Sequence, residues 1–274
     1  MRLRTPPGFP RSAGYDLDWQ LEGTMGPNAL WLAEALTQVL AIEPGEKVLD
    51  LGCGKALSSI FLAREFWAQV WAADLWIPVE DNQKRVAEAG VGDRVMPVRA
   101  EAHALPFEDA AFDVVISLDA YHYFGTDDLY VGTIARLLRP GGRFGIVVPG
   151  LRVDVTSEGI PPHLQPFWHW DFVSFHSPDW WRRHWEKTGL LQVEQADWIP
   201  DGWRHWLAWM EICADRGQAG AAAERDMLVK DAGRTLGFAR VIGRRPAEGQ
   251  AAVPAQPAAE VPADGPPKSR PEPE

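Results

Sequence analysis

Residues 48–63 read VLDLGCGKALSSIFLA, and this stretch decides the fold. An apolar run ends in Asp50, a Gly-x-Gly turn follows at Gly52 and Gly54, and an apolar segment of helix length begins directly afterwards. Glycines let the backbone turn tightly and let a ligand approach the main chain, while the start of a helix presents free N–H groups. The stretch predicts a strand, a ligand-binding turn and a helix, although a lone Gly-x-Gly also fits an ordinary turn.

Strand-length apolar runs alternate with helix-length segments through most of the chain, which is typical of a parallel sheet with crossover helices. The predicted strands are 46–51, 68–74, 93–98, 112–118, 143–149, 190–199 and 235–243. The predicted helices are 56–67, 80–89, 127–138 and a helix opened by Ser177 that runs to Gly189. Residues 138–142, LRPGG, predict a turn before the fifth strand. We therefore expect an α/β, Rossmann-like, doubly wound sheet of seven mostly parallel strands.

Four segments fall outside this alternation. Residues 1–29 form an N-terminal segment that is either a lid over the site or a simply packed end. Residues 151–176, rich in proline, aromatic residues and histidine, predict a cap after the fifth strand, and residues 200–234 predict a helical insertion between the sixth and seventh strands. The Pro/Ala/Glu composition of residues 246–274 predicts a disordered tail. One domain, residues 30–245, is expected to carry the function.

The composition excludes several classes of protein. The 274 residues include 46% apolar side chains, enough for a large core, and 38 Asp and Glu against 27 Lys and Arg give a net charge of −11. That sign disfavours nucleic acid as a partner. Cys53 and Cys213 have no metal-ligand spacing, and no apolar stretch has the length of a leader or a membrane span. We expect a cytoplasmic protein with no bound metal and no integral membrane association.

Two further features of the sequence restrict the kind of ligand that the glycine turn could bind. The third glycine of the nicotinamide-binding fingerprint is replaced by Leu57, which disfavours a dinucleotide. The second predicted strand ends in Asp74, twenty residues after Gly54, where a carboxylate can accept the hydroxyl groups of a ribose. Residues 101–107, EAHALPF, followed by FDVVISL, resemble a segment that lies beside an adenine. A nucleoside ligand is therefore predicted.

These motifs together resemble those of class I S-adenosylmethionine-dependent methyltransferases. VLDLGCG, an acid ending the second strand, EAHALPF, FDVVISLDAYHY and LLRPGGRF occur in this order between residues 28 and 150. The chain is most similar to the small-molecule type, which includes ubiquinone/menaquinone C-methyltransferases and proteins labelled cyclopropane-fatty-acid-synthase-like. The resemblance implies S-adenosylmethionine as the cofactor and leaves the substrate open.

The resemblance also implies roles for residues at the methionine end of the cofactor. Asp50, Gly52 and Gly54 would line this end, and Asp119, at the end of the fourth strand, would lie near the methionyl group. The family's usual glycine two residues after Gly54 is Ala56 here, which predicts altered packing of the turn.

At the nucleoside end, the resemblance implies that Asp74 binds the ribose and that Leu75 packs on the adenine. Glu101, with the backbone of Ala102, would meet the adenine amino group.

Candidate catalytic residues follow the fourth strand, because open α/β sheets bind ligands at the carboxyl ends of their strands. His122 titrates near neutrality and is a candidate base, with a buried structural histidine as the alternative. Tyr121 is a second catalytic candidate, and Tyr123 is expected in the wall of the substrate pocket.

Nine of the fourteen tryptophans lie between Trp168 and Trp209. Trp168, His169 and Trp170, in the predicted cap, are candidate substrate-binding residues, because aromatic side chains there would form an apolar lid. Trp203, Trp206, Met210 and Cys213 share one helical face and are expected in the core.

The leading hypothesis is an S-adenosylmethionine-dependent methyltransferase that acts on a small molecule enclosed by the aromatic cap. The alternatives are a non-catalytic S-adenosylmethionine-binding or regulatory protein, a lipid-modifying enzyme of the cyclopropane-synthase-like kind, and a nicotinamide-dependent oxidoreductase. The sequence indicates neither the methyl-accepting atom nor an oligomeric state.

Overall fold

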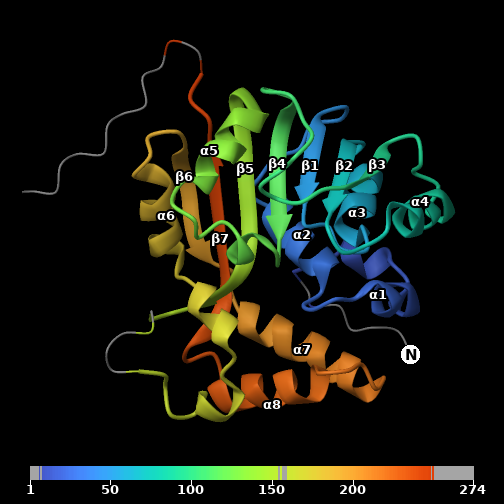
Figure 1. Cartoon of the computed structure of the whole chain (residues 1–274). Helices are drawn as coiled ribbons and strands as arrows, with labels where there is room; N and C mark the ends of the chain where they lie inside the picture. Colours follow the sequence, from blue (N-terminus) through green and yellow to red (C-terminus); the bar gives the residue numbers. More distant parts are fainter. Residues whose placement is uncertain (1–5, 7, 154, 156–158, 248, 250–274) are drawn as a thin grey trace, which may run out of the picture.

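The computed structural model describes residues 6, 8–153, 155, 159–247 and 249. A seven-stranded sheet of order β3-β2-β1-β4-β5-β7-β6 runs through the middle of the molecule (Figure 1). The strands are β1 Lys47–Leu51, β2 Gln69–Asp74, β3 Val95–Arg99, β4 Phe112–Leu118, β5 Leu138–Leu151, β6 Gln192–Trp198 and β7 Leu236–Arg244. This sheet confirms the predicted fold class.

The strand directions explain why the sheet is only mostly parallel. β1 pairs in parallel with β2 and β4, β3 pairs with β2, and β5 pairs with β4. β7 runs antiparallel to both β5 and β6. The carboxyl ends of β1, β2 and β4 therefore meet at one edge of the sheet.

Helices cover both faces of the sheet, as a doubly wound fold requires. They are α1 Leu17–Gly23, α2 Ala29–Thr37, α3 Leu57–Phe66, α4 Val79–Glu88, α5 Tyr130–Leu137, α6 Pro178–Glu186, α7 Gly202–Asp215 and α8 Ala221–Asp231. Successive strand residues point to opposite faces. Accordingly, Val48 of β1 lies in an apolar cluster with residues of α2, α3 and α7, and its neighbour Leu49 lies in a second cluster with residues of α5 and α6.

The start of β5 differs from the expected turn at residues 138–142. Leu138 already pairs with Phe112 of β4, and the regular register resumes at Val114 and Arg143. Gly141, with φ of +78°, lies between these two pairings. The residues that predict a turn therefore form an irregularity within a strand, because their neighbours on both sides stay paired with β4.

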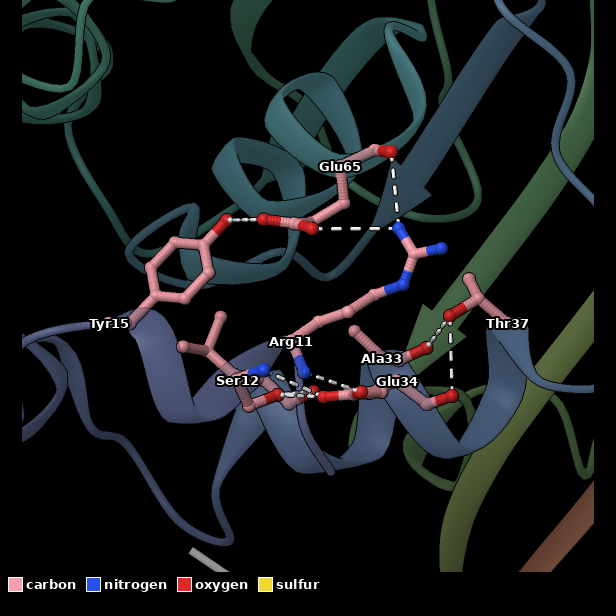
Figure 2. Close-up of polar contacts among 8 residues, drawn as sticks. Arg11, Ser12, Tyr15, Ala33, Glu34, Thr37 and Glu65 are labelled. Carbon is pink, nitrogen blue, oxygen red and sulfur yellow. Dashed lines mark hydrogen bonds and ion pairs between the residues drawn. The ribbon is translucent and has the colours of Figure 1, made fainter. Parts of the chain in front are cut away.

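The N-terminal segment is tied to α2 and α3 by buried polar contacts (Figure 2). The Glu34 carboxylate, 3% exposed, accepts the Ser12 N–H at 2.7 Å, the Ser12 hydroxyl at 2.6 Å and the Arg11 N–H at 2.9 Å. Tyr15 donates its hydroxyl to Glu65 of α3 at 3.1 Å. Because a buried carboxylate without donors would be costly, Glu34 fixes the path of the chain into α1.

The predicted helical insertion is present as α7 and α8, near α1 at the end of the sheet to which the β4 arrow points (Figure 1). Trp206, Met210 and Cys213 are buried, as their spacing predicts, whereas Trp203 is only partly buried. The predicted cap contains two short 3-10 helices, Gln165–Phe167 and Trp170–Ser174. Apart from residues 246, 247 and 249, the predicted tail lies outside the described residues.

The described residues contain neither a helix that could span a membrane nor a cluster of metal-binding side chains. None of their helices combines the length and the apolar character needed to cross a bilayer. Nor do three or more of their His, Cys, Asp or Glu side chains gather in a way that could hold a metal ion.

Candidate functional site

A cavity of about 240 Å³ lies at the carboxyl ends of β1, β2 and β4. Its walls come from the glycine turn after β1, the residues that follow β2, β3 and β4, the segment before α2, and α7. The residues that line it include Met25, Gly26, Gly52, Gly54, Lys55, Asp74, Leu75, Glu101, Ala102, Asp119, Tyr123, Phe124 and Trp209.

Positions 52 and 54 of the turn require glycine, both for their backbone conformation and because a side chain would not fit. Gly52 and Gly54 have φ of +76° and +53°, a region that other residues rarely adopt. A Cβ at Gly52 would lie 2.4 Å from the Ala120 Cβ, and a Cβ at Gly54 would lie 2.8 Å from the Met25 sulfur. Both glycines line the cavity, as the sequence predicts.

Asp74 connects the end of β2 to the glycine turn. Its Oδ2 accepts the Gly54 N–H at 2.9 Å, and its Oδ1 accepts the N–H groups of Trp76 and Ile77 at 2.8 and 3.0 Å. Asp74 is 8% exposed and lines the cavity beside Leu75, which is 44% exposed. A carboxylate is thus held at the cavity wall by three backbone donors.

Asp50 occupies a different position from the predicted one. It does not line the cavity; its Oδ2 instead accepts hydroxyl bonds of 2.6 Å from Ser58 and Ser59 at the start of α3. Burial raises the pKa of Asp50 to about 6, although both serine bonds favour the ionised form. Its Oδ1 is buried without a partner among the described residues. Asp50 therefore supports the glycine turn from behind the cavity wall.

Glu101 and Ala102 follow β3, and both line the cavity. The exposed Glu101 carboxylate accepts the His103 N–H and contacts the His103 ring, each at 2.9 Å, and the contact with this ring lowers the pKa of Glu101. The Ala102 carbonyl accepts the Tyr130 hydroxyl at 2.9 Å. These contacts fix the segment that the resemblance places beside adenine.

Asp119 is the lining carboxylate whose oxygens accept no hydrogen bond from the described residues. It follows β4 with φ of +52°, and its N–H donates to the Val147 carbonyl at 2.8 Å, which orients the residue toward the cavity. Burial, and then the nearby Glu224, raise the pKa of Asp119 well above its usual value. A Cβ at Gly26 would lie 2.7 Å from Asp119 Oδ2.

The predicted catalytic residues are not in the cavity wall. His122 is 1% exposed, and burial lowers its pKa to about 3, which makes it a poor base at neutral pH. Tyr121 is fully buried, with its ring 5.0 Å from that of Phe144. Both are core residues in this structure, and we do not retain them as catalytic candidates.

Tyr123 does line the cavity and is 56% exposed. Burial, followed by the charges of Asp119 and other acids, raises its pKa to about 12, so its hydroxyl stays protonated at neutral pH. It fits the predicted place in a pocket wall.

The three substrate-binding candidates of the predicted cap lie outside the cavity wall. Trp168 is partly buried against the core, with its ring 5.3 Å from that of Phe172. His169 is exposed and contacts Asp171 at 2.7 Å, and Trp170 is 75% exposed. None lines the cavity, so the structure does not bring these residues to the site.

Sequence reasoning missed two parts of the site. Trp209 lines the cavity, although no role was predicted for it from the sequence. Lys55 is the one Lys or Arg among the lining residues, and its ammonium group donates to the Glu22 carbonyl at 2.8 Å. The segment 23–29, considered as a possible lid, forms much of one wall.

The lining residues fit a nucleoside that carries positive charge. Three carboxylates line the cavity, those of Asp74, Glu101 and Asp119, and Asp119 has no cation beside it among the described residues. S-adenosylmethionine carries a sulfonium and an ammonium group, and an unpaired carboxylate near a cavity favours such charges. Asp74 is held next to the glycine turn, and its binding of a ribose stays a prediction.

The strand order, the glycine turn after β1 and the acid that ends β2 define the fold of class I S-adenosylmethionine-dependent methyltransferases. Residues 48–142 match the protein family described as methyltransferase domain. The match agrees with the family that the sequence resembles, and S-adenosylmethionine is the cofactor that this resemblance implies.

Similar curated sequences and similar solved structures are named as methyltransferases. Methyltransferase GfsG from Streptomyces halstedii is 35% identical over 133 residues, 47% of this chain and 48% of the relative, so the match spans about half the length of each. The structure of a putative sarcosine dimethylglycine methyltransferase from Galdieria sulphuraria has a TM-score of 0.64 at 21% identity, covering 80% of this chain and 84% of that one. A geranyl diphosphate methyltransferase in complex with S-adenosylmethionine has a TM-score of 0.63 at 19% identity, covering 80% and 85%. At these identities, the two structures show the fold alone.

Proposed function

We propose that this chain is an S-adenosylmethionine-dependent methyltransferase that transfers the methyl group to a small molecule by direct substitution. The observation that carries the proposal is the cavity that joins the glycine turn, Asp74 and the unpaired Asp119 at one edge of the sheet. The family match of residues 48–142 supports the same activity. Two free, buried cysteines are consistent with the proposed cytoplasmic location.

Each part of the cavity has a separate task in this proposal. When bound, S-adenosylmethionine supplies an electrophilic methyl group. Asp74 accepts hydrogen bonds from the ribose hydroxyls, and Leu75 provides an apolar surface for the adenine. The segment 23–29 covers the cavity and excludes water, which aligns the reactants and favours transfer over hydrolysis.

Asp119 is the proposed proton acceptor for the methyl-accepting group. It lies in the cavity wall near Tyr123, and a carboxylate with a raised pKa is a stronger base than an ordinary aspartate. Tyr123, Phe124 and Trp209 give this end of the cavity aromatic walls. The aromatic enclosure that the sequence assigned to the cap is therefore proposed for these three residues instead.

The charges of the lining residues favour a neutral or cationic acceptor. The single lining cation, Lys55, is engaged by a backbone carbonyl, so an anionic acceptor would meet carboxylates without a compensating group among the described residues. An amine, as in the name of the sarcosine dimethylglycine methyltransferase, suits this site better than a diphosphate, as in that of the geranyl diphosphate enzyme.

The test is formation of S-adenosylhomocysteine from S-adenosylmethionine with a panel of small amines, phenols, a geranyl diphosphate and a dispersed phospholipid. The proposal predicts turnover with an amine or phenol, lost in Asp119→Asn and kept in Asp93→Asn, which alters an exposed acid outside the site. Binding of S-adenosylmethionine without turnover on any acceptor would favour the non-catalytic alternative. Turnover on the phospholipid would favour the lipid-modifying one.

A further inference from the structure

Trp209 of α7 contacts the segment 23–29, which lines the cavity. Its indole N–H donates to the Thr24 hydroxyl oxygen at 3.2 Å and to the Gly26 carbonyl at 3.1 Å. The Thr24 hydroxyl in turn donates to the same carbonyl at 3.0 Å. The Trp209 ring is 1% exposed, and its two bonds are part-buried because Thr24 and Gly26 line the cavity.

The bonded segment lies across the cofactor cavity. Met25 reaches the glycine turn, where its sulfur lies 2.8 Å from the position of a Cβ on Gly54. The next residue, Gly26, packs against the carboxylate of Asp119. Residues 24–26 thus extend from the methionine end of the proposed cofactor site to the proposed proton acceptor, and Trp209 holds them at Thr24 and Gly26.

Other contacts bring the insertion and the N-terminal segment together. The Gln218 side chain, just after α7, donates to the Leu21 carbonyl at 3.2 Å, and Arg216 pairs with the exposed Asp18 at 2.6 Å. In Figure 1, α1 and α7 lie at the same end of the sheet. The Trp209 bonds differ from these in reaching two residues that line the cavity, Thr24 and Gly26.

We propose that Trp209 is a positioning residue whose indole N–H holds residues 24–26 closed over the cofactor. The insertion between β6 and β7 then controls cofactor retention and exclusion of water, in addition to packing on the sheet. The inference rests on the proposed binding of S-adenosylmethionine in this cavity. It is independent of which acceptor is methylated.

The variant Trp209→Phe removes the N–H but keeps an aromatic ring against Trp31, whose ring centre lies 5.7 Å from that of Trp209. Trp206→Phe is the matched control on the same helix. Trp206 is also buried and also donates its indole N–H, but to Glu224 of α8, and its ring stacks on Phe238 at 4.9 Å. Both variants lose one buried indole donor, and only the first loses a contact with the segment.

The measurements are calorimetric titration with S-adenosylhomocysteine and hydrogen exchange of residues 20–32, each with urea unfolding to verify the fold. We expect Trp209→Phe to raise the Kd roughly three- to tenfold, the range for one hydrogen bond, and to accelerate exchange in the bound state. Trp206→Phe should leave both unchanged. A Kd and exchange pattern in Trp209→Phe equal to those of the wild type would overturn the inference.

Thr24→Val tests the same contact from the other side, without altering α7. Because Thr24 and Trp209 share one set of bonds, we expect the double variant to weaken binding by less than the product of the two single effects. Independent effects would contradict the inference. Absence of binding by the wild type would overturn the proposed function itself, whereas wild-type binding with an unaffected Trp209→Phe would overturn only the role of Trp209.

Discussion

The carboxylate of Asp74 accepts the backbone N–H of Gly54 at 2.9 Å, which joins the end of β2 to the turn after β1. The same side chain lines the cavity, so one residue shapes the glycine turn and presents an acceptor for the ligand. Loss of the Asp74 side chain is therefore expected to affect both ligand binding and the stability of the fold.

Asp74→Ala is expected to weaken S-adenosylhomocysteine binding by about 1–3 kcal/mol, because charged hydrogen bonds to the ribose are lost. It should also lower the free energy of unfolding, since three backbone N–H groups lose their acceptor. Calorimetry and urea unfolding measure the two effects, with Asp93→Ala as an exposed-acid control. An unchanged Kd in folded Asp74→Ala protein would exclude the ribose assignment.

Asp119→Asn is expected to stabilise the free chain at neutral pH. Because burial raises the pKa of Asp119, the folded state favours its protonated form, and stability is lost as pH rises from about 4 through the raised pKa. The neutral amide avoids that loss. Thermal unfolding should therefore show a higher midpoint for the variant at pH 8, and a gain that shrinks toward pH 4. A variant less stable than the wild type at pH 8 would argue against an unpaired carboxylate whose charged form is disfavoured by its partly buried surroundings.

Ser59→Ala probes the buried Asp50, whose pKa is raised to about 6. At pH 8 the serine bond is made to a charged carboxylate, and its loss should cost about 1.5–3 kcal/mol of unfolding free energy. At pH 5 Asp50 is mostly protonated, and the cost should fall to about 1 kcal/mol. Thr37→Ala is the control, because its hydroxyl bonds a neutral carbonyl at 2.8 Å and its cost should not depend on pH.

His122→Asn tests the reassignment of His122 from base to core residue. Because burial lowers the pKa of His122 to about 3, the folded state favours the neutral ring, and stability is lost as pH falls below about 6.5. Between pH 7 and pH 5 the wild type should lose about 2 kcal/mol more than the variant, whatever their difference at pH 7. Parallel curves in urea unfolding at several pH values would show that the ring is not held neutral.

Local sequence patterns were sufficient to predict the strands of the sheet and the position of the glycine turn. Strand runs such as 112–118 alternate with helices along the chain. Gly52 and Gly54 come just after β1, and Asp74 is the last residue of β2, so their spacing predicts their place. The turn predicted at residues 138–142 is wrong, because pairing of β5 with β4 on both sides of these residues keeps them within the strand.

The rest of the site depends on contacts between distant residues. Trp209 meets Gly26 across 183 positions, and no periodicity within α7 distinguishes a core tryptophan from one that also reaches the cavity. His122 and Tyr123 are adjacent in sequence, yet one is buried and the other exposed to the cavity. Only the packing around the short 3-10 helix Tyr121–Tyr123 decides which of them can meet a ligand.

The most direct test of the central claim is calorimetric titration of the full chain with S-adenosylmethionine and, in parallel, with NAD. The cavity formed by the glycine turn, Asp74 and the segment 23–29 predicts one site per chain for S-adenosylmethionine, weakened in Asp74→Ala, and no binding of NAD. Binding of NAD with no heat from S-adenosylmethionine would contradict the account.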